Sequence, residues 1–162
     1  MRSEKVTEAT TRFAGAKLAL FLGSQLLVIR RDDRPDIPFP DHWDLPGGGR
    51  EGEESPLDCA LRETREEVGL VVPGERVGWG VSYMRPTGRM WFFTAHLAEG
   101  YVDRIQFGDE GQGWRLMAPA DYIRHPRAIP HFADRIAQYL ESSSYRRFGL
   151  DASLQSRGCE TT

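Results

Sequence analysis

Three glutamates, Glu63, Glu66 and Glu67, fall within five residues of a segment that has helical spacing, and residues 47–70 around them hold seven acidic side chains. Like charges at positions i and i+4 of a helix repel each other, so Glu63 and Glu67 destabilise the segment unless something compensates. Mg²⁺ prefers oxygen ligands and commonly bridges carboxylates to substrate phosphates. The pattern therefore indicates a divalent-cation site, and the alternative is the solvated charged face found on many surface helices.

Three glycines, Gly47, Gly48 and Gly49, directly precede the acidic segment. Glycine permits the backbone to approach a metal or a phosphate closely and to adopt positive φ. The run lacks the Lys-Ser/Thr of a P-loop, and a glycine-rich loop alone is more often a simple turn. Next to the glutamates, it predicts a loop that joins a strand to a metal-binding helix and places Gly48 against the substrate.

The same stretch resembles the Nudix box, G-x5-E-x7-R-E-U-x-E-E-x-G-U, in which U is apolar. Two departures from the family pattern are visible: Thr64 stands where an aliphatic residue is usual, and Gly52-Glu53 stands where a variable residue and then glycine are more frequent. Neither departure removes a carboxylate. The fixed positions of the box are filled by Gly48, Glu54, Arg62, Glu63, Thr64, Glu66, Glu67, Gly69 and Leu70.

The resemblance implies a hydrolase that cleaves a nucleoside diphosphate linked to another group, with Mg²⁺ or Mn²⁺ as cofactor. It implies that Glu63, Glu66 and Glu67 bind the metal together with the carbonyl of Gly47. One carboxylate would accept a proton from the attacking water, and within the box Glu63 and Glu66 are the catalytic candidates. Arg62 and Glu54 match a pair that braces the glycine-rich segment on the helix.

A second resemblance concerns the substrate. Glu110, in FGDEGQGWRLM, resembles the glutamate of the EGQ loop of MutT-type nucleoside triphosphatases, which implies a metal ligand or a general base; otherwise it belongs to a surface turn. Arg31, in LVIRR, matches an arginine of that subgroup that contacts substrate phosphate; otherwise it is a strand-end cation. The purine-reading asparagine of the subgroup has no clear counterpart, because Ile129 stands there.

These residues predict cleavage of a nucleoside triphosphate to a nucleoside monophosphate and pyrophosphate. The alternative is an ADP-ribose or nucleoside-diphosphate-sugar pyrophosphatase, because Pro86 lies near a position where such relatives carry a proline. A non-catalytic nucleotide-binding module is a third reading, although such a module would be expected to lose its metal carboxylates. Aromatic residues of the predicted strands could include a stacking partner for the base, although they are more often core: Trp43, Trp79, Tyr83, Trp91, Phe92 and Phe93.

The helix that must hold the glutamates has clear ends. Ser55 is expected to cap it, Pro56 to be its first residue, and Gly69 to end it in a left-handed conformation, about thirteen residues later. Its glutamates occupy an arc beside the apolar stripe, at the rim of the core. That stripe, which can face a sheet, consists of Leu57, Ala60, Leu61, Thr64 and Val68.

Apolar, β-prone runs predict the strands that support the helix. Residues 13–22 and 25–31 predict one hairpin, and residues 76–84 and 89–98 predict another. The order of elements predicts an α/β fold, a mixed β-sheet with helices against it, which agrees with the α/β/α sandwich that the Nudix resemblance implies. The remaining predicted elements are a surface loop, two short strands and a closing helix, at residues 32–42, 42–46, 113–119 and 129–141.

Length and composition set the remaining expectations. The chain has 162 residues, 40% hydrophobic and 28% charged, with a net charge of −3, which suits one folded domain and a small-molecule nucleotide substrate rather than duplex nucleic acid. Its two cysteines fit no zinc spacing, and no apolar run approaches the length of a membrane span, so we expect a cytoplasmic protein. We expect a domain over residues 1–142, a flexible tail over residues 143–162, and a monomer or homodimer.

Overall fold

A mixed seven-stranded sheet carries the site, and β1 (Gly15–Leu22) is one of its central strands. In the computed structural model, which describes residues 12–149, β1 runs parallel to β6 (Gly88–Leu97) and antiparallel to β2 (Gln25–Arg30). The two predicted hairpins are confirmed, since β1 pairs with β2, and β5 (Val77–Arg85) pairs with β6. The outer strands β3 and β7 both pair with β2, at Trp43–Asp44 and Gly113–Met117.

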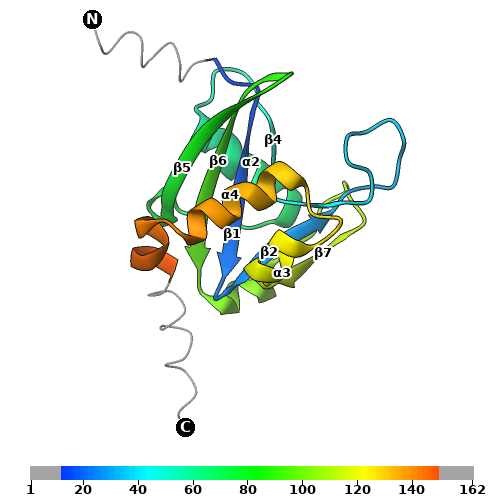
Figure 1. Ribbon diagram of the computed structural model, residues 1–162. Helices are drawn as coiled ribbons and strands as arrows, with labels where there is room; N and C mark the ends of the chain where they lie inside the picture. The colour runs from blue at the N-terminus through cyan, green and yellow to red at the C-terminus, as the bar shows by residue number, and fades with distance from the viewer. Residues whose placement is uncertain (1–11, 150–162) are drawn as a thin grey trace, which may run out of the picture.

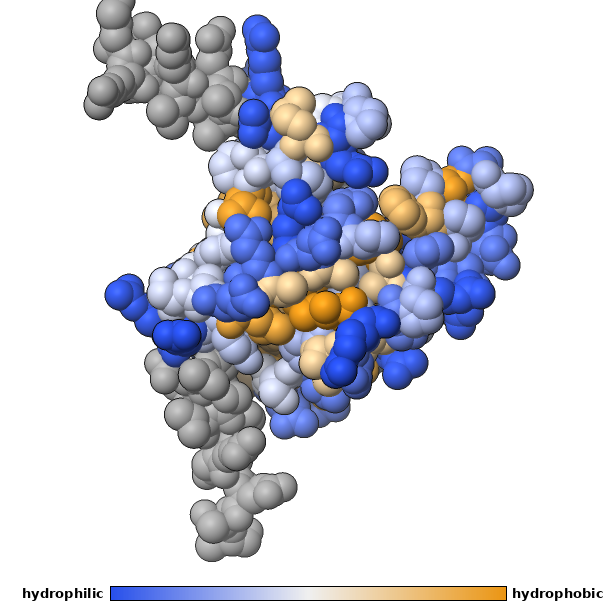
Figure 2. Space-filling view, viewed as in Figure 1, coloured by the Kyte–Doolittle hydropathy of each residue, from blue (hydrophilic) through white to orange (hydrophobic). Residues whose placement is uncertain are grey.

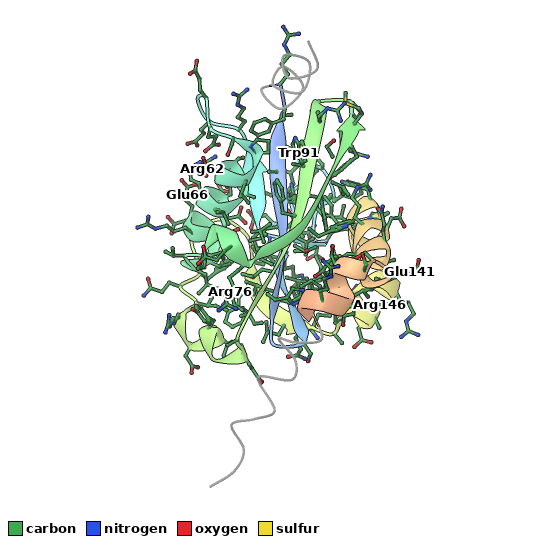
Figure 3. All side chains as sticks on the ribbon, turned by 90° about the vertical axis from the view of Figure 1, so that its left-hand side faces the viewer. Arg62, Glu66, Arg76, Trp91, Glu141 and Arg146 are labelled. Carbon is green, nitrogen blue, oxygen red and sulfur yellow. The ribbon has the colours of Figure 1, made fainter. Side chains whose placement is uncertain are left out.

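Helices cover both faces of this sheet, and the turned view in Figure 3 shows them on opposite sides of the strands. Helix α2 (Pro56–Val68) lies on one face, and α4 (Pro130–Leu140) lies on the other together with α3 (Pro119–Arg124) (Figure 1). Side chains alternate along β1 between two cores, so every residue of the strand is buried. The predicted α/β/α sandwich is therefore confirmed. Leu18, Leu20 and Leu22 face the core under α2, and Ala19 and Phe21 face the core under α4.

The predicted helix ends are confirmed. The Ser55 hydroxyl accepts the N–H of Asp58 at 3.1 Å, and Gly69 has a φ of 73° with its N–H donated to the Arg65 carbonyl. The usual aliphatic position is occupied by a fully buried Thr64, whose hydroxyl donates to the carbonyl of Ala60 at 2.7 Å. This bond satisfies the hydroxyl within the helix, so the polar substitution is tolerated in the core.

The glycine run is not the loop that the sequence predicts. Gly47–Gly49 forms a short strand, β4, that pairs antiparallel with the beginning of β1, and Lys17 lies opposite Gly47. Gly47 has a φ of 139°, and a Cβ there would lie 2.2 Å from the Ala16 carbonyl oxygen. Only glycine permits this close pairing, which fixes the strand directly beside α2.

Several short elements have no counterpart in the predicted order. They are α3, two 3₁₀ helices over Gly74–Arg76 and Glu99–Arg104, and a π-helix over Tyr145–Gly149. The Tyr145 ring lies 5.5 Å from that of Tyr139 in α4. The predicted tail of residues 143–162 includes this last segment, and its part from residue 150 onward lies outside the described residues. Within residues 12–149, no helix combines the length and apolar character that crossing a bilayer requires.

Candidate active site

The glutamates of α2 lie directly beside β4. Glu67 accepts the N–H of Gly47 at 3.2 Å, so the buried end of the helix is tied to the glycine strand. A Cβ at Gly48 would lie 2.7 Å from the carboxyl carbon of Glu63. The missing side chain of Gly48 is therefore what lets the Glu63 carboxylate rest against the strand.

Glu67 has an unusual electrostatic environment. Burial raises the pKa of Glu67 to about 8, and the nearby Asp44 and Glu63 carboxylates act in the same direction. The Lys17 ammonium and the hydrogen bond from Gly47 lower the pKa and oppose this rise. A bound cation would act like Lys17 and favour the charged carboxylate.

Lys17 and Asp44 form a buried ion pair in the wall of the site, and the sequence analysis did not predict either residue as part of it. Lys17 is 9% exposed, and its ammonium donates to the carbonyls of Leu45 and Gly47 at 3.1 and 3.0 Å and lies 3.1 Å from the Asp44 carboxylate. Asp44 also accepts from Arg31 at 2.8 Å. A signal was present, because Lys17 is the only charged residue in the apolar run of residues 13–22.

Arg62 connects the outer carboxylates of the site. It donates to Glu54 at 2.8 and 2.9 Å, and this hydrogen bonding lowers the pKa of Glu54 to about 2. The same guanidinium lies 3.1 Å from both Glu63 and Glu66, and Figure 3 labels Arg62 and Glu66 on α2. Arg62 also donates to the Gly49 carbonyl at 3.0 Å, so it ties Glu54 and the helix to β4.

The donor set fits a hard divalent cation. Glu63, Glu66, Glu67 and the Gly47 carbonyl supply oxygen atoms only, and the carboxylates lie on successive turns of one helix beside a strand without side chains. Among residues 12–149, no three His, Cys, Asp or Glu side chains already stand close enough together to hold an ion. Glu63 and Glu66 each direct one carboxylate oxygen to Arg62, which leaves the second oxygen of each for a cation.

Most of the predicted site residues meet around one cavity of about 440 Å³. Glu66 is more peripheral, with 55% of its side chain exposed, and it does not line the cavity; nor do Glu54 and Arg62. Glu110, from the loop before β7, does line it, next to Gly111. The predicted residues that line the cavity are Arg31, Gly47, Gly48, Glu63, Glu67 and Glu110.

A second cavity, of about 280 Å³, adjoins the first and shares Lys17, Arg31 and Asp44 with it. Its wall is largely aromatic and apolar. His131 lies at the centre of the aromatic cluster, with ring centroids 5.8 Å from Phe39 and 5.9 Å from Tyr83. Of the aromatic residues that the sequence offered as stacking partners, only Tyr83 lines this cavity. Arg85, Pro86, Ile129 and Phe132 also line this cavity.

Solved structures with the same fold include the MutT protein from Methanosarcina mazei Go1, at 18% identity and a TM-score of 0.62, covering 80% of this chain and 96% of that one. An Ap4A hydrolase from C. elegans matches with 20% identity and a TM-score of 0.61, covering 77% and 94%. At these identities the likeness concerns the fold.

Curated relatives match over shorter stretches. Diphosphoinositol polyphosphate phosphohydrolase 3-alpha of Homo sapiens is 30% identical over 82 residues, 48% of this chain and 50% of that protein. An RNA pyrophosphohydrolase of Rhodospirillum rubrum is 37% identical over 73 residues, 41% of each chain. The chain thus spans half or less of the length of these relatives. The NUDIX domain family model matches residues 12–140, which is most of the chain, and this protein therefore belongs to the Nudix family.

Proposed function

We propose that this protein is a Mg²⁺-dependent pyrophosphohydrolase that cleaves a nucleoside triphosphate to a nucleoside monophosphate and pyrophosphate. The observation that carries the proposal is the pair of adjoining cavities. One is lined by Glu63, Glu67 and Glu110, the other is largely apolar and aromatic, and Arg31 lines both. Phosphates fit the first cavity and a base fits the second, with Arg31 between them.

Each residue has a defined task in this proposal. Glu63, Glu66, Glu67 and the Gly47 carbonyl would hold the metal, which would neutralise phosphoryl charge and lower the pKa of bound water. Glu110, which lines the same cavity, would accept a proton as general base. Arg31 would donate to a phosphate oxygen, and its contacts with Asp44 and the Pro38 carbonyl already orient its guanidinium.

The second cavity bears on the substrate class. A diphosphoinositol polyphosphate, the ligand in the name of the human relative, carries many phosphates and no aromatic ring. Phe39, Tyr83 and Phe132 favour an aromatic base instead. Ile129 also lines this wall, so no amide side chain is offered there for reading a purine edge.

A nucleoside-diphosphate sugar such as ADP-ribose is the second candidate. The observation that favours it is that Pro86, the residue predicted to matter for such substrates, lines the second cavity together with Arg85. Both candidates are small nucleotides, which the net charge of −3 supports over duplex nucleic acid. The proposed setting is the cytoplasm, with the protein as a monomer or homodimer.

The test is a substrate panel with products identified by mass. It should contain nucleoside triphosphates and their oxidised forms, ADP-ribose, dinucleoside polyphosphates, a diphosphoinositol polyphosphate and RNA with a 5′-triphosphate, each with Mg²⁺, with Mn²⁺ and with chelator. We expect pyrophosphate and a nucleoside monophosphate, with no turnover in chelator. Cleavage confined to ADP-ribose would support the second candidate, and a protein that binds nucleotides but releases no product would be a binding module.

A further inference from the structure

The loop between β2 and β3, residues 32–42, contributes to both cavities. It projects from the body of the molecule in Figure 1 and stands out as a separate lobe with polar and apolar atoms in Figure 2. Its base is closed by two backbone hydrogen bonds, from Arg31 to His42 at 2.9 Å and from Asp41 to Asp32 at 3.1 Å. Its lining residues are Asp32, Arg34 and Ile37 in the first cavity and Pro38 and Phe39 in the second.

Asp41 lies at the base of this loop in a strained conformation. Its φ is 57°, and Phe39 and Asp41 are the non-glycine residues with positive φ among residues 12–149. Such backbone conformations persist only where surrounding interactions fix them, and they are frequent at functional sites. Asp41 is therefore held in this conformation by its surroundings.

The carboxylate of Asp41 gathers donors from three parts of the chain. It accepts from Arg30 Nε at 2.6 Å, from Gln112 Nε2 at 2.8 Å, and from Arg127 Nη1. These donors come from the end of β2, the loop before β7 and the connection between α3 and α4. The side chain is 14% exposed, and hydrogen bonding with Arg30 lowers the pKa of Asp41 to about 2, so the carboxylate stays charged at neutral pH.

Gln112 extends this arrangement to Glu110. Its side chain donates to the Arg31 carbonyl at 2.7 Å as well as to Asp41, and its backbone N–H donates to the Arg30 carbonyl at 2.8 Å. Glu110 is only two residues away in the same loop, and Gly111 between them has a φ of 91°. The hydrogen bonds of one side chain thus connect the strand end that carries Arg31 with the loop that carries Glu110.

We propose that Asp41 and Gln112 are positioning residues that hold Arg31 and Glu110 at fixed places on the same cavity. Neither lines either of these two cavities; they act through Arg31, which lines both, and through the loop of Glu110. The inference rests on the proposed function of the first cavity. It predicts that loosening one residue of the pair disturbs substrate binding and turnover together.

The variants separate charge, backbone strain and coupling. Asp41→Gly removes the carboxylate but tolerates the positive φ, whereas Asp41→Asn keeps one acceptor oxygen and also tolerates that backbone. Gln112→Ala breaks the connection from the other side. The matched control is Asp33→Gly in the same loop, because Asp33 is exposed and lines neither of the two cavities.

With the preferred substrate we expect Asp41→Gly and Gln112→Ala to raise KM and lower kcat, each on the order of 10-fold, because Arg31 and Glu110 both lose their fixed places. Asp41→Asn should restore part of the loss in both KM and kcat, and Asp33→Gly should match wild type. The double variant should be little worse than either single variant, since both break one connection. Additive losses would overturn the proposal, as would a change confined to KM or to kcat.

A second measurement needs no substrate. In the protein without ligand, amide hydrogen exchange over residues 31–42 and 108–112 should accelerate together in Asp41→Gly and in Gln112→Ala, while exchange in α2 stays as in wild type. Unchanged exchange over residues 108–112 in Asp41→Gly would overturn the connection. If wild type cleaves no nucleotide, the proposed function fails, and exchange alone then decides whether Asp41 and Gln112 hold the two segments together.

Discussion

Glu67 carries a carboxylate at a buried position, where its charged form is disfavoured. Burial above all raises the pKa of Glu67 to about 8, and a bound cation would favour the charged carboxylate. Glu67→Gln keeps the shape and the acceptor for Gly47 but removes the charge. We expect kcat to fall at least about 100-fold and the melting temperature in chelator to stay unchanged or rise. Mg²⁺ titrations of turnover and melting would show it, and an active variant would remove Glu67 from the metal site.

Lys17 should contribute to stability more than to chemistry. Its ammonium is buried with Asp44, and removing one member of a buried pair leaves the other uncompensated. We expect Lys17→Met to cost about 3 kcal/mol in the free energy of unfolding, measured with urea. The double variant Lys17→Met with Asp44→Asn should regain part of this loss. If Lys17→Met left the free energy of unfolding unchanged, Arg31 alone would be sufficient to pair with Asp44.

Residues of the site differ in how far the sequence could predict them. Glu63, Glu67, Gly47 and Gly48 belong to one local segment, so their spacing on a helix and the strand before it fixes their relation. Phe39 and His131 meet across the second cavity although they lie far apart in the chain. No local pattern reports such a contact, because pairing between distant elements creates it.

At the scale of elements, the close approach of β4 to α2 leads to a testable prediction. Gly48 has a backbone that accepts a side chain, but its Cβ would collide with the Glu63 carboxylate at 2.7 Å. Gly48→Ala should therefore displace a flexible carboxylate, lowering kcat about 10-fold or more with little change in melting temperature. At Gly49 a Cβ meets only the Ala14 carbonyl oxygen, at 3.9 Å, so Gly49→Ala should lose far less activity. Equal activities in the two variants would contradict the role of Gly48.

The same strand shows why one element was mispredicted. Three consecutive glycines have low strand propensity, so local reasoning favours a loop. They form β4 because they pair with Gly15, Ala16 and Lys17 of β1, and at Gly47 a Cβ would lie 2.2 Å from the Ala16 carbonyl oxygen. Helix α3 was missed for another reason, since its six residues are too few to show helical periodicity.

For the whole molecule, the sequence predicted the layers better than the strand order. Apolar runs identified most strands and both long helices, and α2 and α4 cover opposite faces as a three-layer fold requires (Figure 3). The parallel pairing of β1 with β6 joins segments that lie far apart in the chain. Both strands are apolar enough to pair with several others, so burial on both faces, rather than a sequence pattern, selects this neighbour.

A histidine buried in the core under α4, His96, leads to a prediction of how the stability of the whole molecule depends on pH. Burial lowers the pKa of His96 to about 4, where the ring stacks on Phe21 at 4.5 Å and lies 2.6 Å from the Tyr139 hydroxyl. Between pH 6.5 and 4, His96 therefore binds a proton in the unfolded chain but stays neutral in the folded chain. The free energy of unfolding thus falls as pH decreases through this window. From a shift of that size we expect a contribution of about 3 kcal/mol from His96.

The measurement must separate His96 from groups that titrate nearby. Burial also lowers the pKa of His131 to about 4, which acts in the same direction, whereas the raised pKa of Glu67 favours the folded state as pH falls from 8 towards 4.5. Urea unfolding of wild type and His96→Gln at several pH values between 7 and 4 isolates the His96 contribution, because the other groups are common to both. The variant should be less stable than wild type at pH 7 and lose less on acidification. Parallel stability curves would mean that His96 takes up its proton at the same pH in the folded and the unfolded protein.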